Sequence, residues 1–484
     1  MNGHDAYDHL DQFYINGAFV SPHGQSRREI VDPATEEVVA EIAMADETDV
    51  ERAVQAAKRA FKTFGFSSRE QRLDLLQKIL DIYNARSEEF AVRMTAEMGT
   101  PISFSQQVQT PLAGAHIAEN IKALKSFQLE VRRGSTSIVR EPIGVCSLIT
   151  PWNWPMLQVI TKVAPAIAAG CTIILKPSEY SPLSALLFAE VMHEAGVPPG
   201  VFNLINGDGP VAGTALSVHP DIDMVSFTGS TRAGILVAKN AADTVKRVHQ
   251  ELGGKSANIV LPDVDLERAV YKAVDGCYLN AGQSCSAPTR LLVPSHLRER
   301  AGEIAKAAAE AFRPGGTFDP STTLGPVVNS GQHARVMQKI QAGIDEGATL
   351  VTGGTGRPLG MNRGYYVKPT VFANVDPSMI VSREEIFGPV LAIQSYNSVD
   401  EAIEIANDTV YGLAAYVQSA DLSAARKVAA RLRAGDVYLN YPSGDISAPF
   451  GGYKQSGNGR EYGEGGIDAF LEVKSIIGCY EATQ

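Results

Sequence analysis

Three side chains in this sequence have the chemistry of a covalent catalyst. Cys285 lies among small and polar residues at 282–287, Gly-Gln-Ser-Cys-Ser-Ala, which is typical of an accessible thiol. Glu251 begins the run Glu-Leu-Gly-Gly after a predicted strand, where a carboxylate can reach a shared cleft as a general base. Asn153 lies between the two tryptophans of the chain, and its amide can donate to an oxyanion. Each residue also has a structural explanation, as a buried thiol, a surface charge or part of a packed Pro/Trp corner.

The cysteine count favours a single working thiol over a cysteine scaffold. Five cysteines are few for 484 residues, their number is odd, and no Cys-x-x-Cys pair occurs. We therefore expect neither a disulfide framework nor a metal site, and a reducing compartment fits best. The five residues are Cys146, Cys171, Cys277, Cys285 and Cys479.

Two motifs have the residues that bind the phosphates and ribose of a nucleotide. Residues 227–234, Phe-Thr-Gly-Ser-Thr-Arg-Ala-Gly, follow a predicted strand and open a predicted helix, whose free N–H groups attract an anion such as a pyrophosphate. Residues 176–179, Lys-Pro-Ser-Glu, follow another strand at the edge where parallel sheets bind ligands. The carboxylate of Glu179 would repel a 2′-phosphate, which favours NAD over NADP. Taken alone, the first motif is more typical of an ordinary strand–helix turn, and the second is more typical of a solvated loop.

Other phosphate motifs are absent or incomplete. Residues 253–256, Gly-Gly-Lys-Ser, resemble the end of a P-loop, but His249 occupies the required earlier glycine position. No Gly-x-Gly-x-x-Gly occurs.

The elements that must position these groups alternate between strands and helices from residue 143 onward. Strands separated by helical segments predict βαβ units and a parallel sheet, which looks like a dinucleotide-binding domain of Rossmann type. The predicted strands are 144–149, 172–175, 201–205, 224–227 and 247–250, with helices at 184–193, 210–217 and 232–242.

A second α/β series follows Gly253, and mainly helical segments precede the first. The second series comprises segments 266–280, 290–293, 297–312, 365–372, 390–396, 400–407 and 420–432, and a final strand at 469–477 is expected to pair with another subunit. Before the first series, residues 14–17 predict a strand and turn, and helical spacing begins after a predicted N-cap at Asp46 or Thr48. Further helices are predicted at 73–86 and 107–127.

Length and composition exclude several classes of protein. A chain of 484 residues predicts roughly two to four domains, and 44% hydrophobic with 20% charged residues is ordinary for a globular protein. The net charge of −11 argues against nucleic acid as the main partner. The uncharged stretch 143–161 contains two prolines, an Asn and a Gln, which a membrane helix tolerates poorly, and residues 1–10 are not typical of a signal peptide. We expect a soluble cytoplasmic protein.

Taken in order, the motifs resemble those of the aldehyde dehydrogenase superfamily over almost the full chain. The matching segments are 151–155 (Pro-Trp-Asn-Trp-Pro), 176–179, 227–230, 251–256, 282–285, 384–389 (Glu-Glu-Ile-Phe-Gly-Pro) and 449–457 (Pro-Phe-Gly-Gly-Tyr-Lys-Gln-Ser-Gly). The resemblance implies an α/β fold with three parts. These are an NAD-binding domain of residues 1–123 and 143–252, a catalytic domain of 253–455, and an oligomerisation flap with a C-terminal strand, 124–142 and 456–484.

The same resemblance implies a role for each candidate residue. Cys285 would attack an aldehyde, giving a thiohemiacetal and then a thioester; Asn153 would stabilise the oxyanion, and Glu251 would activate the water that releases the acid. The expected cofactor-binding residues are Ile149, Thr150, Pro151, Trp152, Lys176, Ser178, Glu179, Gly209, Phe227, Gly229, Ser230, Leu252, Glu385 and Phe387. The expected substrate pocket comprises Trp154, Leu157, Gln158, Ser284, Ser286 and Phe450.

The resemblance therefore implies an NAD-dependent oxidoreductase that acts on aldehydes and forms a homodimer or homotetramer. The substrate class that fits the pocket residues is a medium-length aliphatic or aromatic aldehyde, because no anion clamp or carboxylate cage is evident. A CoA-acylating semialdehyde dehydrogenase is the nearest alternative, followed by a redox-inactive cysteine esterase and a non-catalytic protein with a relict site. Three positions depart from the common pattern of the family: Trp154, Arg232 and Pro288.

Overall fold

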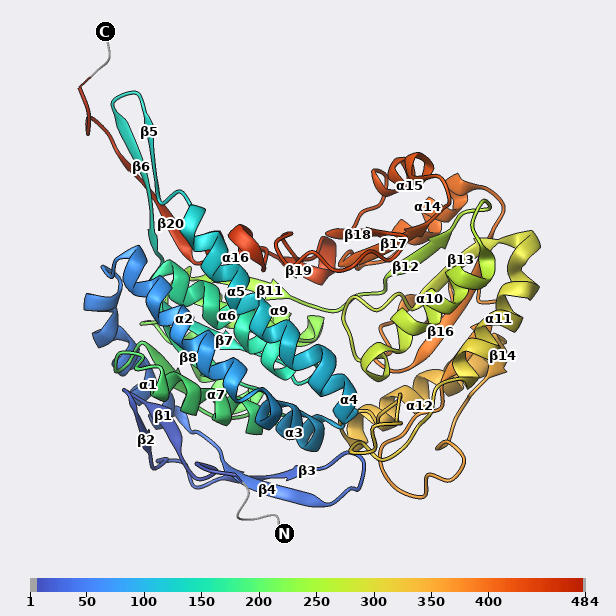
Figure 1. Cartoon of the computed structure of the whole chain (residues 1–484), viewed down its shortest axis with the longest axis horizontal. Helices are drawn as coiled ribbons and strands as arrows, with labels where there is room; N and C mark the ends of the chain where they lie inside the picture. The colour runs from blue at the N-terminus through green and yellow to red at the C-terminus, as the bar shows by residue number, and fades with distance from the viewer. Residues whose placement is uncertain (1–6, 482–484) are drawn as a thin grey trace.

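The computed structural model describes residues 7–481, and its largest sheet has eight strands in the order β19-β11-β10-β7-β8-β9-β1-β2 (Figure 1). The five central strands are parallel, and the outer three pair antiparallel at the edges. Their bounds are β1 (Phe13–Ile15), β2 (Ala18–Val20), β7 (Val145–Ile149), β8 (Thr172–Lys176), β9 (Phe202–Leu204), β10 (Met224–Thr228), β11 (Arg247–Glu251) and β19 (Gly457–Asn458). The five strands predicted between residues 144 and 250 are therefore confirmed within a few residues.

Helices cover both faces of this sheet because its central strands are buried on both sides. Alternate residues of β7 enter two separate cores: Cys146 and Leu148 join one, Val145 and Ile149 the other. The first core is closed by α2 (Arg69–Ala85), α3 (Ser87–Met98), α5 (Thr110–Ser126), α6 (Pro155–Ala169) and α7 (Leu183–Glu194). The second is closed by α1 (Glu47–Phe64), α8 (Thr214–Val218) and α9 (Thr231–Ala241).

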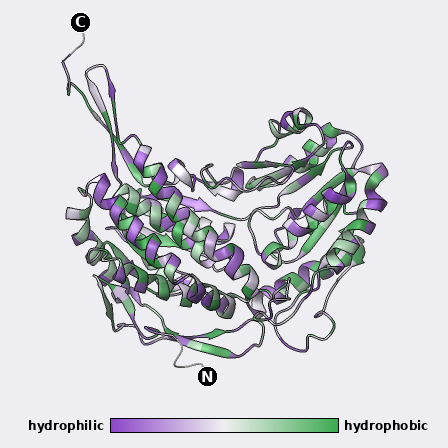
Figure 2. Cartoon of the chain, viewed as in Figure 1, coloured by the Kyte–Doolittle hydropathy of each residue, from purple (hydrophilic) through white to green (hydrophobic). Residues whose placement is uncertain are grey.

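A second sheet of seven strands has the order β14-β15-β16-β13-β12-β17-β18, with all pairs parallel except β14–β15. Its strands are β12 (Ala257–Val260), β13 (Arg290–Pro294), β14 (Thr349–Thr352), β15 (Thr370–Ala373), β16 (Val390–Tyr396), β17 (Ala414–Gln418) and β18 (Asp436–Leu439). The helices around it are α10 (Leu266–Tyr278), α11 (Arg298–Glu310), α12 (Ser330–Asp345), α13 (Ile380–Arg383), α14 (Val399–Asn407) and α15 (Leu422–Ala429). Figure 2 shows hydrophobic and hydrophilic residues alternating along these helices, as two-faced helices require.

Two smaller sheets complete the fold. β5 (Glu130–Arg133), β6 (Thr136–Pro142) and β20 (Leu471–Ile476) form an antiparallel sheet that projects from one end of the molecule (Figure 1). β3 (Arg27–Val31) pairs with β4 (Val38–Ala43). The remaining short helices are α4 (Ile102–Phe104) and α16 (Gly463–Ala469). Among the described residues, no helix combines the length and apolar character that a bilayer crossing requires.

Local signals predicted most boundaries, and two departures have physical causes. The N-cap at Asp46 is confirmed, since its side chain accepts from Thr48 N and Asp49 N. The segment predicted at 365–372 becomes a strand only at Thr370, because Tyr365 bonds instead to the backbone of two loops, through Pro33 O and Val327 N. The helix predicted at 210–217 begins as a π-helical turn, Gly209–Gly213.

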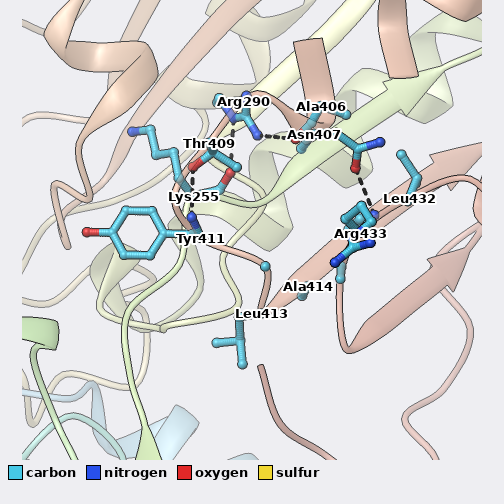
Figure 3. A pocket seen from close by; sticks show the side chains of 14 residues that line it. Lys255, Arg290, Ala406, Asn407, Thr409, Tyr411, Leu413, Ala414, Leu432 and Arg433 are labelled. Carbon is cyan, nitrogen blue, oxygen red and sulfur yellow. Dashed lines mark hydrogen bonds between the residues drawn. The ribbon is translucent and has the colours of Figure 1, made fainter. Parts of the chain in front are cut away.

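Arg290, on β13, connects its own strand to the loop before β12 and to the end of α14. Its side chain is 2% exposed and donates to Lys255 O at 3.0 Å, Ile405 O at 2.9 Å and Ala406 O at 2.9 Å. Figure 3 shows Arg290 with Lys255 and Ala406 in the small polar pocket that these residues line together with Arg433. The guanidinium therefore satisfies carbonyl groups from the loop before β12 and from the end of α14.

Replacement of Arg290 by methionine is expected to destabilise this part of the molecule. Three charge-assisted hydrogen bonds are lost and their buried carbonyls remain unsatisfied, which costs about 3 kcal/mol. We expect the thermal unfolding midpoint to fall by roughly 5 °C or more. Arg300→Met, which breaks an exposed pair with Glu303, is the matched control and costs about 0.5 kcal/mol. Equal shifts in the two variants would contradict this role of Arg290.

Candidate active site

A cavity of about 570 Å³ opens at the carboxyl ends of β7 and β10. The chain connects β7 to β8 on one side and β10 to β11 on the other, so this is the point where the strand order reverses. Residues from both large sheets line the cavity, including Cys285, Asn153 and all fourteen residues expected from the sequence to bind a cofactor. Motifs far apart in the chain are thus brought around one space.

One end of the cavity is formed by the N-terminus of α9. The N-cap is Ser230, whose hydroxyl accepts from Ala233 N at 3.3 Å. Gly229 and Arg232 lie beside it on the cavity wall. The free N–H groups of a first helical turn attract negative charge, so this end is suited to a pyrophosphate.

Lys176 and Glu179 lie at the end of β8, where they can contact a ribose. The Lys176 ammonium group is buried and donates to Pro177 O at 2.9 Å and Gly207 O at 2.8 Å. It lies 3.8 Å from the carboxylate of Glu179. Burial lowers the pKa of Lys176, and the charge of Glu179 opposes that shift. Ser178 accepts from Tyr180 N, which fixes the turn that carries both charged groups.

Glu385 and Phe387 form the facing wall. Glu385 Oε1 accepts from Gly254 N at 3.1 Å, and burial raises the pKa of this carboxyl to about 7. A Cβ on Gly253 would lie 2.3 Å from Glu385 Oε2, so the carboxylate packs directly against the backbone there. Phe387 has a φ of 58° and meets Trp152 edge to face at 5.4 Å.

The loop that carries Cys285 is held against Asn153 by hydrogen bonds. Asn153 Nδ2 donates to Gln283 O at 3.0 Å, and Asn280 Nδ2 donates to Asn153 O at 2.7 Å. Asn280 and Gly282 have φ values of 55° and 73°, and a Cβ on Gly282 would lie 2.1 Å from Gly388 O. The strained turn therefore fixes the thiol beside the amide that was expected to act on an oxyanion.

Cys285 is partly buried, and among the described cysteines it alone lines this cavity. Burial raises the pKa of its thiol, and the nearby carboxyls of Glu385 and Glu251 raise it further. Backbone N–H groups of Ser286 and Cys285 oppose the shift. The thiol is therefore neutral at pH 7 in this conformation, and its activation requires a change in the surrounding charges.

Glu251 lies at the end of β11, behind the cavity wall rather than on it. Its side chain is 3% exposed, and within residues 7–481 neither carboxyl oxygen has a hydrogen-bond partner. Burial raises the pKa of Glu251 well above its usual range, and the neighbouring Glu461 adds to the effect. Lys162 opposes it but is itself ion-paired with Glu461.

The expected substrate residues lie mainly outside the cavity. Gln158 lines it, whereas Leu157, Trp154, Ser284, Ser286 and Phe450 do not. Trp154 Nε1 donates to Ser284 Oγ at 2.9 Å, and the Trp154 indole meets Phe104 edge to face at 5.5 Å. Ser286 O accepts from Tyr416 OH, and Phe450 stacks on Tyr462 at 5.0 Å.

Helix α12 also contributes to the cavity, which was not predicted from the sequence. Gln332 donates to Ile386 O at 3.2 Å and Phe387 O at 2.9 Å, which anchors the loop that presents Glu385 and Phe387. Asn329 caps this helix by accepting from Gln332 N, so an N-cap signal was present in the sequence. The cavity also contains Tyr180, Thr228, Ala233, Gly253, Arg335, Lys339 and Ile386.

The comparisons with known proteins all find aldehyde dehydrogenases. Residues 19–476 match the model described as the aldehyde dehydrogenase family. A 3-succinoylsemialdehyde-pyridine dehydrogenase from Pseudomonas sp is 49% identical over 473 residues, covering 98% of this chain and 99% of that protein. A mutant of aldehyde dehydrogenase C from Pseudomonas syringae, solved with NAD+ and octanal, has a TM-score of 0.98 and 52% identity over the whole of both chains. An aldehyde dehydrogenase from Bartonella henselae has a TM-score of 0.95 and 49% identity, covering 96% of this chain and 98% of that one.

Replacement of Glu385 by glutamine tests the electrostatics around the thiol. The charge of Glu385 is the largest cause after burial for the raised pKa of Cys285, so its removal increases the thiolate fraction at a given pH. We expect alkylation of Cys285 by iodoacetamide at pH 8 to accelerate by about threefold, which corresponds to half a pKa unit. Peptide mass spectrometry gives the rate, and the exposed Cys479 is the internal control. An unchanged or slower rate at Cys285 would refute this cause.

Proposed function

Because the chain belongs to the aldehyde dehydrogenase family and oxidises aldehydes with NAD, we propose that Cys285, Asn153 and Glu251 carry the reaction. The observation that supports this assignment is that Cys285 and Asn153 line the same cavity as all fourteen residues expected to bind the cofactor. The cavity also fits the cofactor. Its capped helix terminus suits the pyrophosphate, its Lys176–Glu179 pair a ribose, and Glu385 the second ribose.

The reaction follows from the chemistry of a thiol beside an amide. The Cys285 thiolate adds to the aldehyde carbon, forming a C–S bond, and the oxyanion accepts hydrogen bonds from the Asn153 amide and the Cys285 N–H. A bound NAD, held by the residues that line the cavity, would supply the acceptor for the hydride that leaves the substrate carbon. Cys285 then holds the acyl group as a thioester.

Release of the acid needs a base. Glu251, as a carboxylate, takes a proton from water while the water oxygen forms the C–O bond. The C–S bond breaks, and Cys285 leaves as a thiolate. Because the resting pKa of Glu251 is raised, the residue must move or be deprotonated before it can act.

Two alternative reactions are distinguishable by their products. A CoA-acylating enzyme would yield an acyl-CoA, and a cysteine esterase would turn over esters without forming NADH. A buried carboxylate near the thiol supports water as the acceptor, since a thiol acceptor needs no such base.

We also assign a substrate class, a medium-length aliphatic or aromatic aldehyde. Trp154 donates to Ser284, the residue before Cys285, and packs on Phe104, so aromatic side chains lie beside the loop that carries the thiol. The similar Pseudomonas syringae enzyme was solved with octanal, and the similar Pseudomonas sp enzyme is named for a pyridine semialdehyde. Comparison of kcat/KM across straight-chain and aromatic aldehydes separates the two classes.

NAD is proposed as the preferred coenzyme over NADP. The Glu179 carboxylate lies at the ribose end of the cavity, where a 2′-phosphate would meet a like charge. A ratio of kcat/KM for NAD over NADP near one would contradict this preference.

The projecting sheet supports assembly into a homodimer or homotetramer. Its strand β20 carries the exposed side chains of Val473 and Ile476, and Ile477 follows.

We propose that the chain has three parts. The NAD-binding part comprises residues 1–123 and 143–252, the catalytic part 253–455, and the flap with the C-terminal strand 124–142 and 456–484. A cytoplasmic location fits best, because all five cysteines are free thiols.

Replacement of Glu251 by glutamine tests the proposed release step. Without the base, the thioester accumulates, so we expect a burst of about one NADH per active site followed by a slow phase reduced about 100-fold or more. Stopped-flow absorbance at 340 nm measures both phases. Cys285→Ala is the control and is expected to form no NADH while still binding NAD. Equal slowing of the burst and the slow phase in Glu251→Gln would count against the role of Glu251.

A further inference from the structure

His249, which the proposed reaction does not use, forms a buried pair with Glu251. They lie two residues apart on β11, so their side chains point to the same face of the sheet. His249 Nε2 lies 3.6 Å from Glu251 Oε1, and the two side chains are 4% and 3% exposed. In the described part of the chain, neither ring nitrogen and neither carboxyl oxygen has a hydrogen-bond partner. Buried polar groups without partners are rare, so the two side chains are best understood together.

The backbone opposite this pair leaves room for it. Gly451 has a φ of +155°, and a Cβ at that position would lie 2.6 Å from Glu251 Oε1. Gly459 has a φ of +84°, and a Cβ there would lie 2.3 Å from His249 Cδ2. The C-terminal segment therefore passes over both side chains without a side chain of its own at the points of contact.

The surrounding charges determine the protonation of the pair. Glu251 is faced by Glu461, by Lys162 from α6, by Arg460 and by Asp436 from β18. Burial and Glu461 raise the pKa of Glu251, whereas burial, Lys162, Arg460 and Arg247 lower the pKa of His249 to about 3. These shifts favour the acid form of Glu251 and the neutral form of His249. An O–H donor thus faces a ring nitrogen that can accept.

We propose that His249 is a positioning residue that accepts a hydrogen bond from the Glu251 carboxyl and holds this carboxyl in its buried position. The proposal rests on the proposed role of Glu251 as the base for thioester hydrolysis. The 3.6 Å between His249 Nε2 and Glu251 Oε1 is about 0.4 Å longer than a typical hydrogen bond. Because the bond stabilises the acid form of Glu251, His249 sets the pH above which the carboxylate is available to activate water.

The test is the pH dependence of acid release from the acyl-enzyme, measured by rapid quench after one turnover with octanal and NAD. Loss of the acceptor in His249→Leu removes stabilisation of the acid form. The acidic limb of the rate profile is then expected to move down by about half to one pH unit. His249→Gln keeps an acceptor and is expected to move the limb by less than half as much. His116→Leu is the matched control, since His116 is also buried but packs on Tyr462 at 4.2 Å.

The outcomes are decisive in either direction. An acidic limb that does not move in a folded His249→Leu variant reduces His249 to a packing residue and overturns the proposal. A limb that moves to higher pH shows that His249 donates to the carboxylate, which also overturns it. Should the leucine variant fail to fold, His249→Met provides the same loss of acceptor with a flexible side chain.

Glu251→Gln, measured in parallel, separates this proposal from the proposed function. If that variant releases acid at the wild-type rate with the same limb, the role of Glu251 fails and the role of His249 fails with it. If that variant is slow but the limb of His249→Leu is unmoved, only the role of His249 fails.

Discussion

The parallel pairing of β7 with β10 is the constraint on which the site depends. Its register, from Met224 opposite Cys146 to Phe227 opposite Ile149, brings the two strand ends to the same edge of the sheet. From that edge the chain runs on to α6 on one face and to α9 on the other. The divergence leaves a crevice between Asn153 and Ser230, and the second sheet closes it by contributing Cys285 and Glu385. Every proposed step depends on these two strands ending together.

Burial controls the charges in this crevice. It is the largest cause of the raised pKa values of Cys285, Glu251 and Glu385, and of the lowered pKa of Lys176. Around the thiol, burial therefore favours the neutral forms of Cys285, Glu251 and Glu385. The same burial fixes the geometry, because buried polar groups such as Asn153 and Asn280 must find partners in the loop that carries the thiol.

Residues at the ends of apolar runs could be predicted from the sequence. Lys176 and Ser230 each follow a buried strand, so the sheet alone places them at one edge. Gln332 could not be predicted, because its role comes from contacts with a loop more than 50 residues away in the chain. His249 appeared in the sequence only as the residue that breaks a P-loop pattern, yet its spacing of two from Glu251 on a strand already placed both on one face. The expected substrate residues were the least predictable, since most of them lie beside the cavity rather than on it.

The central claim is that the acyl group passes through Cys285 and leaves with the help of Glu251. The most direct measurement is peptide mass spectrometry of Glu251→Gln, quenched in acid after reaction with octanal and NAD. We predict an octanoyl thioester on the peptide that contains Cys285, at about one per subunit, and none after the same reaction with Cys285→Ala. An adduct on another residue, or the absence of any adduct while NADH is formed, would contradict the account.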